Sequence, residues 1–334
     1  MSFESGLPKA ELHVHHVGSA SMRTVAELAE RHAGTTSVPT DPEALADFFT
    51  FTDFAHFIEV YLSVVDLLRT PEDLWTLTHD VGRDLAAQNV RYVELTCTPY
   101  TSIAVGISAE AYCEALEDAR RRAEADFGVT MRWIFDIPGE SGVPAADVTL
   151  DTALRLQPEG LIGFGLGGPE IGVPRPQFKA HFEQARAAGL HSLPHAGEST
   201  GPETIWDAIH VLGAERIGHG IAAAQDPALM AYLAEHQIPL EISPTSNIRT
   251  RSVPSMDQHP LPTLVAAGVP VSINSDDPPM FDTTLTREYE VARDLLGLDD
   301  AGVADLARVG VRQSFAPDDV KSTVLAEIDA YTGS

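Results

Sequence analysis

The chain has 334 residues, of which 44% are hydrophobic and 21% charged, as in a globular protein with a large buried core. Its formal net charge of −27 repels phosphate backbones and anionic membrane surfaces, so we expect no nucleic-acid or membrane partner. Two cysteines, Cys97 and Cys113, are too few for a disulfide framework. We find neither a long apolar run nor a secretion leader, and we expect a cytoplasmic protein.

Short apolar runs alternate with helical patterns along the whole chain. We expect strands at Ala10–His15, Val90–Thr96, Thr130–Asp136, Leu161–Leu166, His191–His195, Glu215–His219, Pro239–Ser243 and Val269–Asn274. Helical patterns between them include Ala109–Phe127, Pro174–Ala188, Thr204–Leu212 and Pro227–Glu235. Strands that alternate with helices pair in parallel through right-handed crossovers, and eight such units close into a barrel. The sequence therefore predicts an α/β fold, a (β/α)8 TIM barrel, as a single domain over residues 1–334.

The connection between the first two predicted strands is much longer than an ordinary loop. We expect a helical insertion there, over about residues 20–85. It contains a run of aromatic residues, Phe48, Phe49, Phe51, Phe54, Phe57 and Tyr61. These side chains suit the core of an inserted pair of helices. They also suit a lid beside the C-terminal face of the barrel, and the two interpretations are compatible.

Residues that can bind a metal ion stand at the C-terminal ends of predicted strands. His13 and His15 end the first strand, His195 ends the fifth, and Asp276 follows the eighth. Residues two apart on a strand point the same way, and the C-terminal strand ends of a barrel meet on one face. A lone His-x-His pair is more often a coincidence of packing, but the four residues together predict one Zn²⁺ per chain with a position open for water.

Three further polar residues lie beside these predicted ligands. Glu198 follows His195 in a turn and can act as a general acid, although a carboxylate at a helix start is common for electrostatic reasons alone. His219, between two glycines, can orient an attacking hydroxide. Asp277 is free to accept a hydrogen bond from a substrate, whereas Asp276 serves catalysis through the metal ion.

Other polar residues receive no chemical role from the sequence. Asp136 ends the third strand without a metal partner, and we expect it to be structural. Histidines outside the motifs, His259 among them, are expected to be surface residues or core residues with satisfied hydrogen bonds.

The combination of motifs resembles the adenosine deaminase family over essentially the full chain. The matching runs are Lys9–Gly18, Gly165–Glu170, His195–Glu198, Arg216–Gly220, Ser243–Asn247 and Ser272–Pro278. The resemblance implies a barrel with one zinc ion that hydrolyses the 6-amino group of a purine and releases ammonia. It assigns zinc binding to His13, His15, His195 and Asp276, with His15 also near the substrate. It further implies protonation of N1 by Glu198, orientation of hydroxide by His219, contact with N7 by Asp277, and contact with N3 by the backbone of Gly168.

Departures from the family pattern bear on the substrate. Members usually read His-x-His-Leu-Asp-Gly, whereas Val17 stands here in place of the carboxylate on the ribose side. Arg249 and Arg251 add positive charge near the rim. These changes suit a nucleoside whose 5′ end is apolar and then acidic, and resemble the branch that deaminates 6-amino-6-deoxyfutalosine in menaquinone biosynthesis. Drift at Val17 and surface ion pairs of the two arginines would also explain the changes, but we favour 6-amino-6-deoxyfutalosine over adenosine as the substrate.

Other functions remain open at this stage. Adenosine deamination in purine salvage is the main alternative, followed by adenine deamination and by non-catalytic purine binding. A binuclear amidohydrolase needs a bridging lysine at the end of the fourth strand, and Lys9, Lys179 and Lys321 are the only lysines. Deaminases that act on nucleic acids bind zinc through paired cysteines, which Cys97 and Cys113 do not provide. The sequence settles neither the oligomeric state nor the choice of zinc over iron or manganese.

Overall fold

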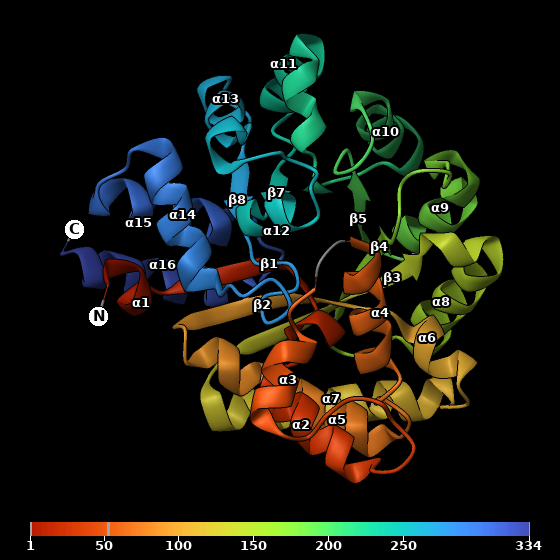
Figure 1. Cartoon of the computed structure of the whole chain (residues 1–334). Coiled ribbons are helices and arrows are strands. Elements are labelled where there is room, and N and C mark those ends of the chain that lie inside the picture. The colour runs from red at the N-terminus through yellow and green to blue at the C-terminus, as the bar shows by residue number, and fades with distance from the viewer. Residues whose placement is uncertain (1, 52–53, 334) are drawn as a thin grey trace.

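The structure is a computed structural model that describes residues 2–51 and 54–333. Eight parallel strands form one sheet in the order of the chain, β1 to β8, with helices around it (Figure 1). The strands are β1 (Lys9–His15), β2 (Val90–Cys97), β3 (Thr130–Pro138), β4 (Leu161–Gly167), β5 (His191–Ala196), β6 (Ile217–His219), β7 (Leu240–Ile242) and β8 (Val271–Ile273). The predicted TIM barrel is confirmed.

The barrel closes between its last and first strands through a few contacts at one level. Val14 and Asp276 form an isolated parallel bridge. The backbone N–H of His15 donates to the carbonyl of Asp276 at 2.9 Å, and the N–H of Asp276 donates to the carbonyl of His13 at 3.0 Å. Three of the four residues predicted to bind metal, His13, His15 and Asp276, therefore lie where the two ends of the sheet meet.

The last three strands are shorter than predicted. Pro239 and Pro270 precede β7 and β8, and because proline has no N–H, each ladder begins only after it. Elsewhere each predicted strand differs from the observed one by one or two residues, at one end only.

The helices follow the strands around the barrel. The α-helices are α1 (Phe3–Gly6), α2 (Met22–Arg31), α3 (Pro42–Phe48), α4 (Phe54–Val65), α5 (Pro71–Ala86), α6 (Pro99–Ala104), α7 (Ala109–Phe127), α8 (Gly142–Leu156), α9 (Lys179–Ala187), α10 (Pro202–Asp207), α11 (Pro227–His236), α12 (Pro244–Arg249), α13 (Leu261–Ala266), α14 (Leu285–Leu296), α15 (Asp300–Gln313) and α16 (Asp318–Thr332). Short helical turns are η1 (Val17–Ser19), η2 (Gly139–Ser141), η3 (Arg175–Phe178), η4 (Ala208–Leu212), η5 (Ile221–Gln225) and η6 (Met256–Gln258).

Local sequence explains several helix ends. The longest predicted helix is confirmed as α7, where the Ser108 side chain accepts the N–H of Ala111 and Gly128 ends the helix in a left-handed conformation. The predicted helix over residues 174–188 is divided into η3 and α9, and that over residues 204–212 into α10 and η4, a turn of π-helix. No described helix is both long and apolar enough to cross a membrane.

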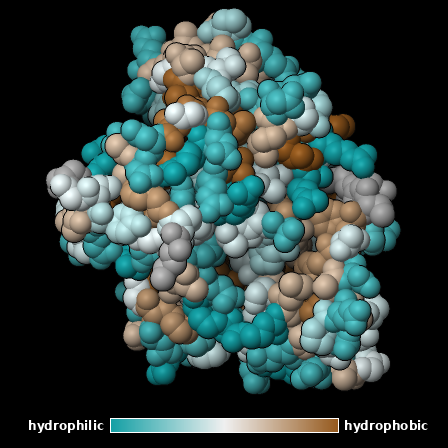
Figure 2. Space-filling view, turned by 60° about the vertical axis from the view of Figure 1, so that its left-hand side comes forward, coloured by the Kyte–Doolittle hydropathy of each residue, from teal (hydrophilic) through white to brown (hydrophobic). Residues whose placement is uncertain are grey.

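The insertion between β1 and β2 contains four α-helices, α2 to α5, rather than the expected pair. Its residues 52 and 53 lie outside the described part of the chain, as does the side chain of Phe54. Hydrophilic residues are spread widely over the face of the molecule seen in Figure 2, with hydrophobic ones in small groups between them.

Candidate active site and metal centre

Four imidazoles crowd together at the C-terminal end of the barrel. The ring centroid of His13 lies 4.5 Å from that of His195, 4.7 Å from that of His219 and 5.4 Å from that of His15. Among the described residues, two sets offer ligand atoms within 4.8 Å of one another, His13 with His195 and His219, and His13 with His15 and Asp276. The structure thus brings the four predicted ligands together, and it adds His219 to the same cluster.

The cluster contains buried polar atoms without a hydrogen-bond partner among the described residues. They are Nε2 of His13, both ring nitrogens of His195 and Oδ1 of Asp276. Buried polar atoms nearly always have a bonding partner. These atoms are therefore available to bind one ligand in common. Imidazole and carboxylate are the donors that catalytic zinc prefers, and the cluster therefore fits a metal ion.

A charged layer below the cluster orients His13. Its Nδ1 hydrogen-bonds Oε2 of Glu241 at 2.8 Å, which leaves Nε2 directed to the cluster. Glu241 is paired through its other oxygen with Arg216 at 2.7 Å, and Arg216 also pairs with Glu94. Burial opposes the charge of Glu241, but Arg216 and the hydrogen bond from His13 hold its pKa below the ordinary value. Partners of this kind fix the tautomer and the direction of a metal-binding histidine.

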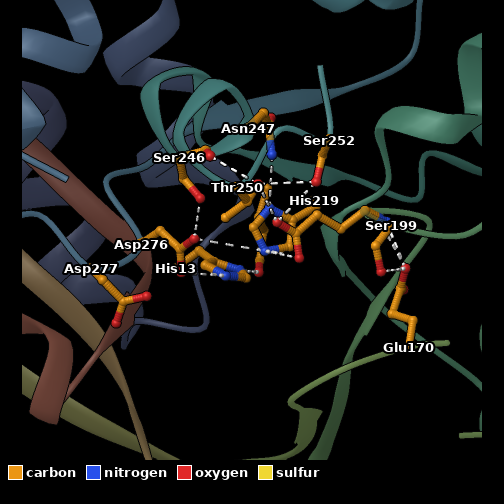
Figure 3. A network of polar contacts seen from close by, with 12 residues as sticks. His13, Glu170, Ser199, His219, Ser246, Asn247, Thr250, Ser252, Asp276 and Asp277 are labelled. Atoms are coloured by element: carbon orange, nitrogen blue, oxygen red, sulfur yellow. Dashed lines mark hydrogen bonds and ion pairs between the residues drawn. The ribbon is translucent and has the colours of Figure 1, made fainter. Parts of the chain in front are cut away.

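Asp276 is held between the cluster and α12. The Ser246 hydroxyl donates to its Oδ2 at 2.5 Å, and Nδ1 of His15 lies 2.9 Å from its Oδ1 (Figure 3). Burial disfavours its charge, yet the adjacent imidazoles of His13 and His15 hold its pKa well below the ordinary value. Its backbone is left-handed, with φ of 66°, which aspartate tolerates better than most residues.

Asp277 depends on a glycine in the loop after β1. A Cβ on Gly18 would lie 1.6 Å from Oδ1 of Asp277, so any larger residue would displace this carboxylate. That oxygen is buried and has no hydrogen-bond partner among the described residues. Asp277 can therefore accept a hydrogen bond from a substrate.

Glu198 stands on a loop that another carboxylate holds in place. Oε2 of Glu170 accepts the backbone N–H groups of Glu198, Ser199 and Thr200 at 3.0, 2.8 and 3.0 Å. The other oxygen of Glu170 faces Arg175 at 3.3 Å. Three successive amides on one oxygen fix the turn, and so fix where the Glu198 side chain begins.

The Glu198 carboxyl group lies beside the imidazoles. Its Oε1 accepts the Thr250 hydroxyl at 3.1 Å, and its Oε2 lies 3.7 Å from Nε2 of His219. Burial raises the pKa of Glu198, although attraction to His219 opposes the shift. A carboxyl group with a raised pKa keeps its proton longer and is suited to act as an acid.

His219 is oriented by a chain of hydrogen bonds that the sequence did not reveal. Nδ2 of Asn247 donates to Nδ1 of His219 at 3.3 Å, so the proton of the neutral ring is on Nε2, toward the cluster. Oδ1 of Asn247 in turn accepts Nε2 of His259 at 3.2 Å. The expectation that His259 is a satisfied core residue is confirmed, but it supports the site.

The remaining residues predicted to contact the substrate lie around the mouth of the barrel, the opening at the C-terminal ends of its strands. Gly168 is exposed and left-handed, with φ of 76°, and a Cβ there would lie 2.3 Å from Oε2 of Glu140. Val17 is half-buried in η1. Arg249 and Arg251 are exposed, on either side of Thr250, which contacts Glu198. Contact of these residues with a substrate remains a prediction.

Helix α4 of the insertion lies beside the site. The ring of Phe57 packs 5.0 Å from that of Phe281 and 6.0 Å from that of Tyr61. Burial raises the pKa of Tyr61, and the charges of Asp277 and Asp136 raise it further. Phe57 is thus part of the core and Tyr61 packs against it, as the core interpretation expected. That the insertion also forms a lid over the substrate remains a prediction.

Comparison with known proteins identifies the family. The sequence model of the family described as adenosine deaminase matches residues 8–331. The chain belongs to the adenosine deaminase family. It is therefore a hydrolytic deaminase that acts on C–N bonds.

Several relatives extend this family assignment. Over the whole chain, the protein is 63% identical to an aminodeoxyfutalosine deaminase of Streptomyces coelicolor, 86% of which is covered. The crystal structure of an adenine deaminase from Arthrobacter aurescens matches with a TM-score of 0.92 at 32% identity, covering 98% of this chain and all of the other. An amidohydrolase from Burkholderia ambifaria, solved with bound zinc, matches with a TM-score of 0.88 at 26% identity, covering 99% and 93%. The family and the donor cluster together indicate a metal-ion site.

Proposed function

We propose that this family member is a zinc-dependent deaminase of a 6-aminopurine nucleoside, and that its substrate is 6-amino-6-deoxyfutalosine. The observation that carries the proposal is the position of Glu198, whose acid group lies against a cluster of unpaired imidazole nitrogens. The substrate follows from the 63% identity to the Streptomyces coelicolor enzyme and from Val17, which removes a carboxylate from the ribose side. We also propose that residues 1–334 act as one barrel domain.

In this proposal, His13, His15, His195 and Asp276 hold the zinc ion. A bound zinc ion supplies a water molecule of lowered pKa. Glu198 donates its proton to N1 of the purine as water attacks C6, because the ring loses aromatic stabilisation and N1 must become neutral N–H. His219 donates a hydrogen bond from Nε2 that orients the attacking water. The attacking water gives up both of its protons: one moves to the 6-amino group, which leaves C6 as ammonia, and the other restores the Glu198 acid. A 6-oxopurine remains.

Other residues would hold the purine in place. Asp277 faces N7, and the N–H of Gly168 faces N3. The purine is therefore held at two of its edges. Arg249 and Arg251 stand at the rim, where they can attract an acidic group at the 5′ end of the nucleoside.

The proposal is tested by following loss of the ultraviolet band of the 6-aminopurine. We expect kcat/KM for aminodeoxyfutalosine to exceed that for adenosine and for adenine. The matched variant Glu198→Gln should keep its zinc, by elemental analysis, and lose about a hundred- to ten-thousand-fold in turnover. A clear preference for adenosine would contradict the proposed substrate, and full activity of the variant would contradict the role of Glu198.

A further inference from the structure

A second buried carboxylate lies at the mouth of the barrel, outside the metal cluster. Asp136 is near the C-terminal end of β3, and only 4% of its surface is exposed. A Cβ on Gly167 would lie 2.7 Å from Oδ2 of Asp136 and 3.9 Å from Cε1 of His195. Asp136 on β3 and His195 on β5 therefore approach Gly167 of β4 from its two sides, at one level of the barrel.

Asp136 has few partners for a buried carboxylate. Its Oδ1 accepts the hydroxyl of Thr98 at 2.6 Å, whereas Oδ2 receives no hydrogen bond from another described side chain. No arginine, lysine or histidine among the described residues forms an ion pair with it, and it belongs to neither set of metal donors. Burying an unpaired carboxylate is costly, and carboxylates of this kind gather where ligands bind.

The proposed function determines where the sugar of the substrate lies. If Gly168, after β4, faces N3 and Asp277, after β8, faces N7, then N9 points between them, away from N1 and C6. The ribose on N9 therefore extends over the ends of β1, β2 and β3, which lie between β8 and β4 in the closed barrel. Asp136 is on β3, and Thr98 directly follows β2.

We propose that Asp136 is a substrate-binding residue that accepts a hydrogen bond from a ribose hydroxyl of the nucleoside. The inference rests on the proposed function. Val17 stands where the family pattern has a ribose-side carboxylate and offers no acceptor, so Asp136 supplies one from another strand. Thr98 is a positioning residue, because its hydroxyl occupies Oδ1 and leaves Oδ2 for the sugar.

The test compares sugars. We would measure kcat/KM for ribonucleosides and their 2′-deoxy and 3′-deoxy analogues, built on both aminodeoxyfutalosine and adenosine. The wild type should favour the ribonucleoside over at least one deoxy analogue by about 10- to 100-fold, the effect of a hydrogen bond to a charged group. Asp136→Asn, which can still bind the Thr98 hydroxyl, and Asp136→Leu should lose this preference through a raised KM. Thr98→Val should lose part of it.

Three results would overturn the inference: an equal loss on all sugars, an unchanged preference in the variants, or loss of metal from Asp136→Asn. Equal losses would mean that Asp136 is structural, and metal loss would mean that it is a ligand. Absence of wild-type turnover on both scaffolds contradicts the proposed function itself. Turnover with an unchanged sugar preference contradicts only the role of Asp136.

Discussion

His259 is a buried histidine whose two ring nitrogens are both hydrogen-bonded in the neutral form. Nδ1 accepts the N–H of Leu261 at 3.1 Å, and Nε2 donates to Asn247. Burial lowers its pKa from 6.5 to about 4. The unfolded chain takes up a proton near pH 6.5 and the folded chain does not. The contribution of neutral His259 to the stability of the folded state is therefore complete above pH 6.5. It is lost as the pH falls toward about 4.

We expect acid to weaken the wild type more than the variant His259→Gln, because glutamine can accept and donate hydrogen bonds but does not titrate. Between about pH 7 and pH 5, the free energy of unfolding of the wild type should fall by about 2 kcal/mol more than that of the variant. Urea unfolding at constant ionic strength measures both. If the two proteins lose stability in parallel over this range, another group is responsible.

The sequence alone predicted the histidines and aspartates of the site. It missed the residues that orient them by hydrogen bonds. Histidines and aspartates at strand ends are conspicuous, and parallel strands bring such ends together. Asn247 and His259 gave no comparable signal, because their roles come from contacts made only after folding. Glu241 gave a weak signal that went unused, since it is a charged residue within a short apolar strand.

At the scale of elements, a single buried ion pair holds the loop after β5. Glu170 accepts three successive amides of that loop while Arg175, only 1% exposed, faces its other oxygen. Removing one charge of a buried pair leaves the other without compensation. The loop that carries Glu198 therefore depends on an ion pair within the preceding connection, between β4 and α9.

We expect Glu170→Gln to lower the free energy of unfolding by about 3 to 5 kcal/mol and to reduce kcat, because Arg175 is left unpaired and the loop loses its charged acceptor. In the double variant with Arg175→Met, stability should largely return while kcat stays low. Urea unfolding and steady-state kinetics separate the two effects. Recovery of kcat in the double variant would show that the charge of Glu170 does not position the loop.

The barrel could be predicted from periodicity because strands and helices alternate along the chain with few exceptions. The insertion was located but its internal structure was not, since its run of aromatic residues suited both a helical core and a lid. The divided helices were also missed. Their breaks lie at η3, which contains Pro176 and so lacks one N–H donor, and at η4, where the apolar pattern continues through the turn of π-helix.

At the scale of the whole molecule, the seam between β8 and β1 has the least backbone pairing in the sheet. Among the described residues, one isolated bridge, Val14 with Asp276, pairs the two backbones, and Asn274 and Glu11 accept further hydrogen bonds across the seam, whereas the other neighbouring strands share ladders. His13 and His15 lie on one side of the seam and Asp276 on the other. A shared metal ion would thus link the two ends of the barrel, so metal binding should stabilise closure as well as serve the reaction.

We therefore expect a chelator to lower Tm, and added zinc to restore it. Metal present at about a hundred times its Kd stabilises the folded state by about 2.7 kcal/mol, which sets the size of the loss. Amide hydrogen exchange should increase first in residues 12–16 and 271–277, at the seam, and least in α7 on the far side of β2. Asp276→Asn serves as the control, because a weakened site should make its Tm insensitive to the chelator. A uniform increase in exchange throughout the barrel would contradict the link between metal binding and closure.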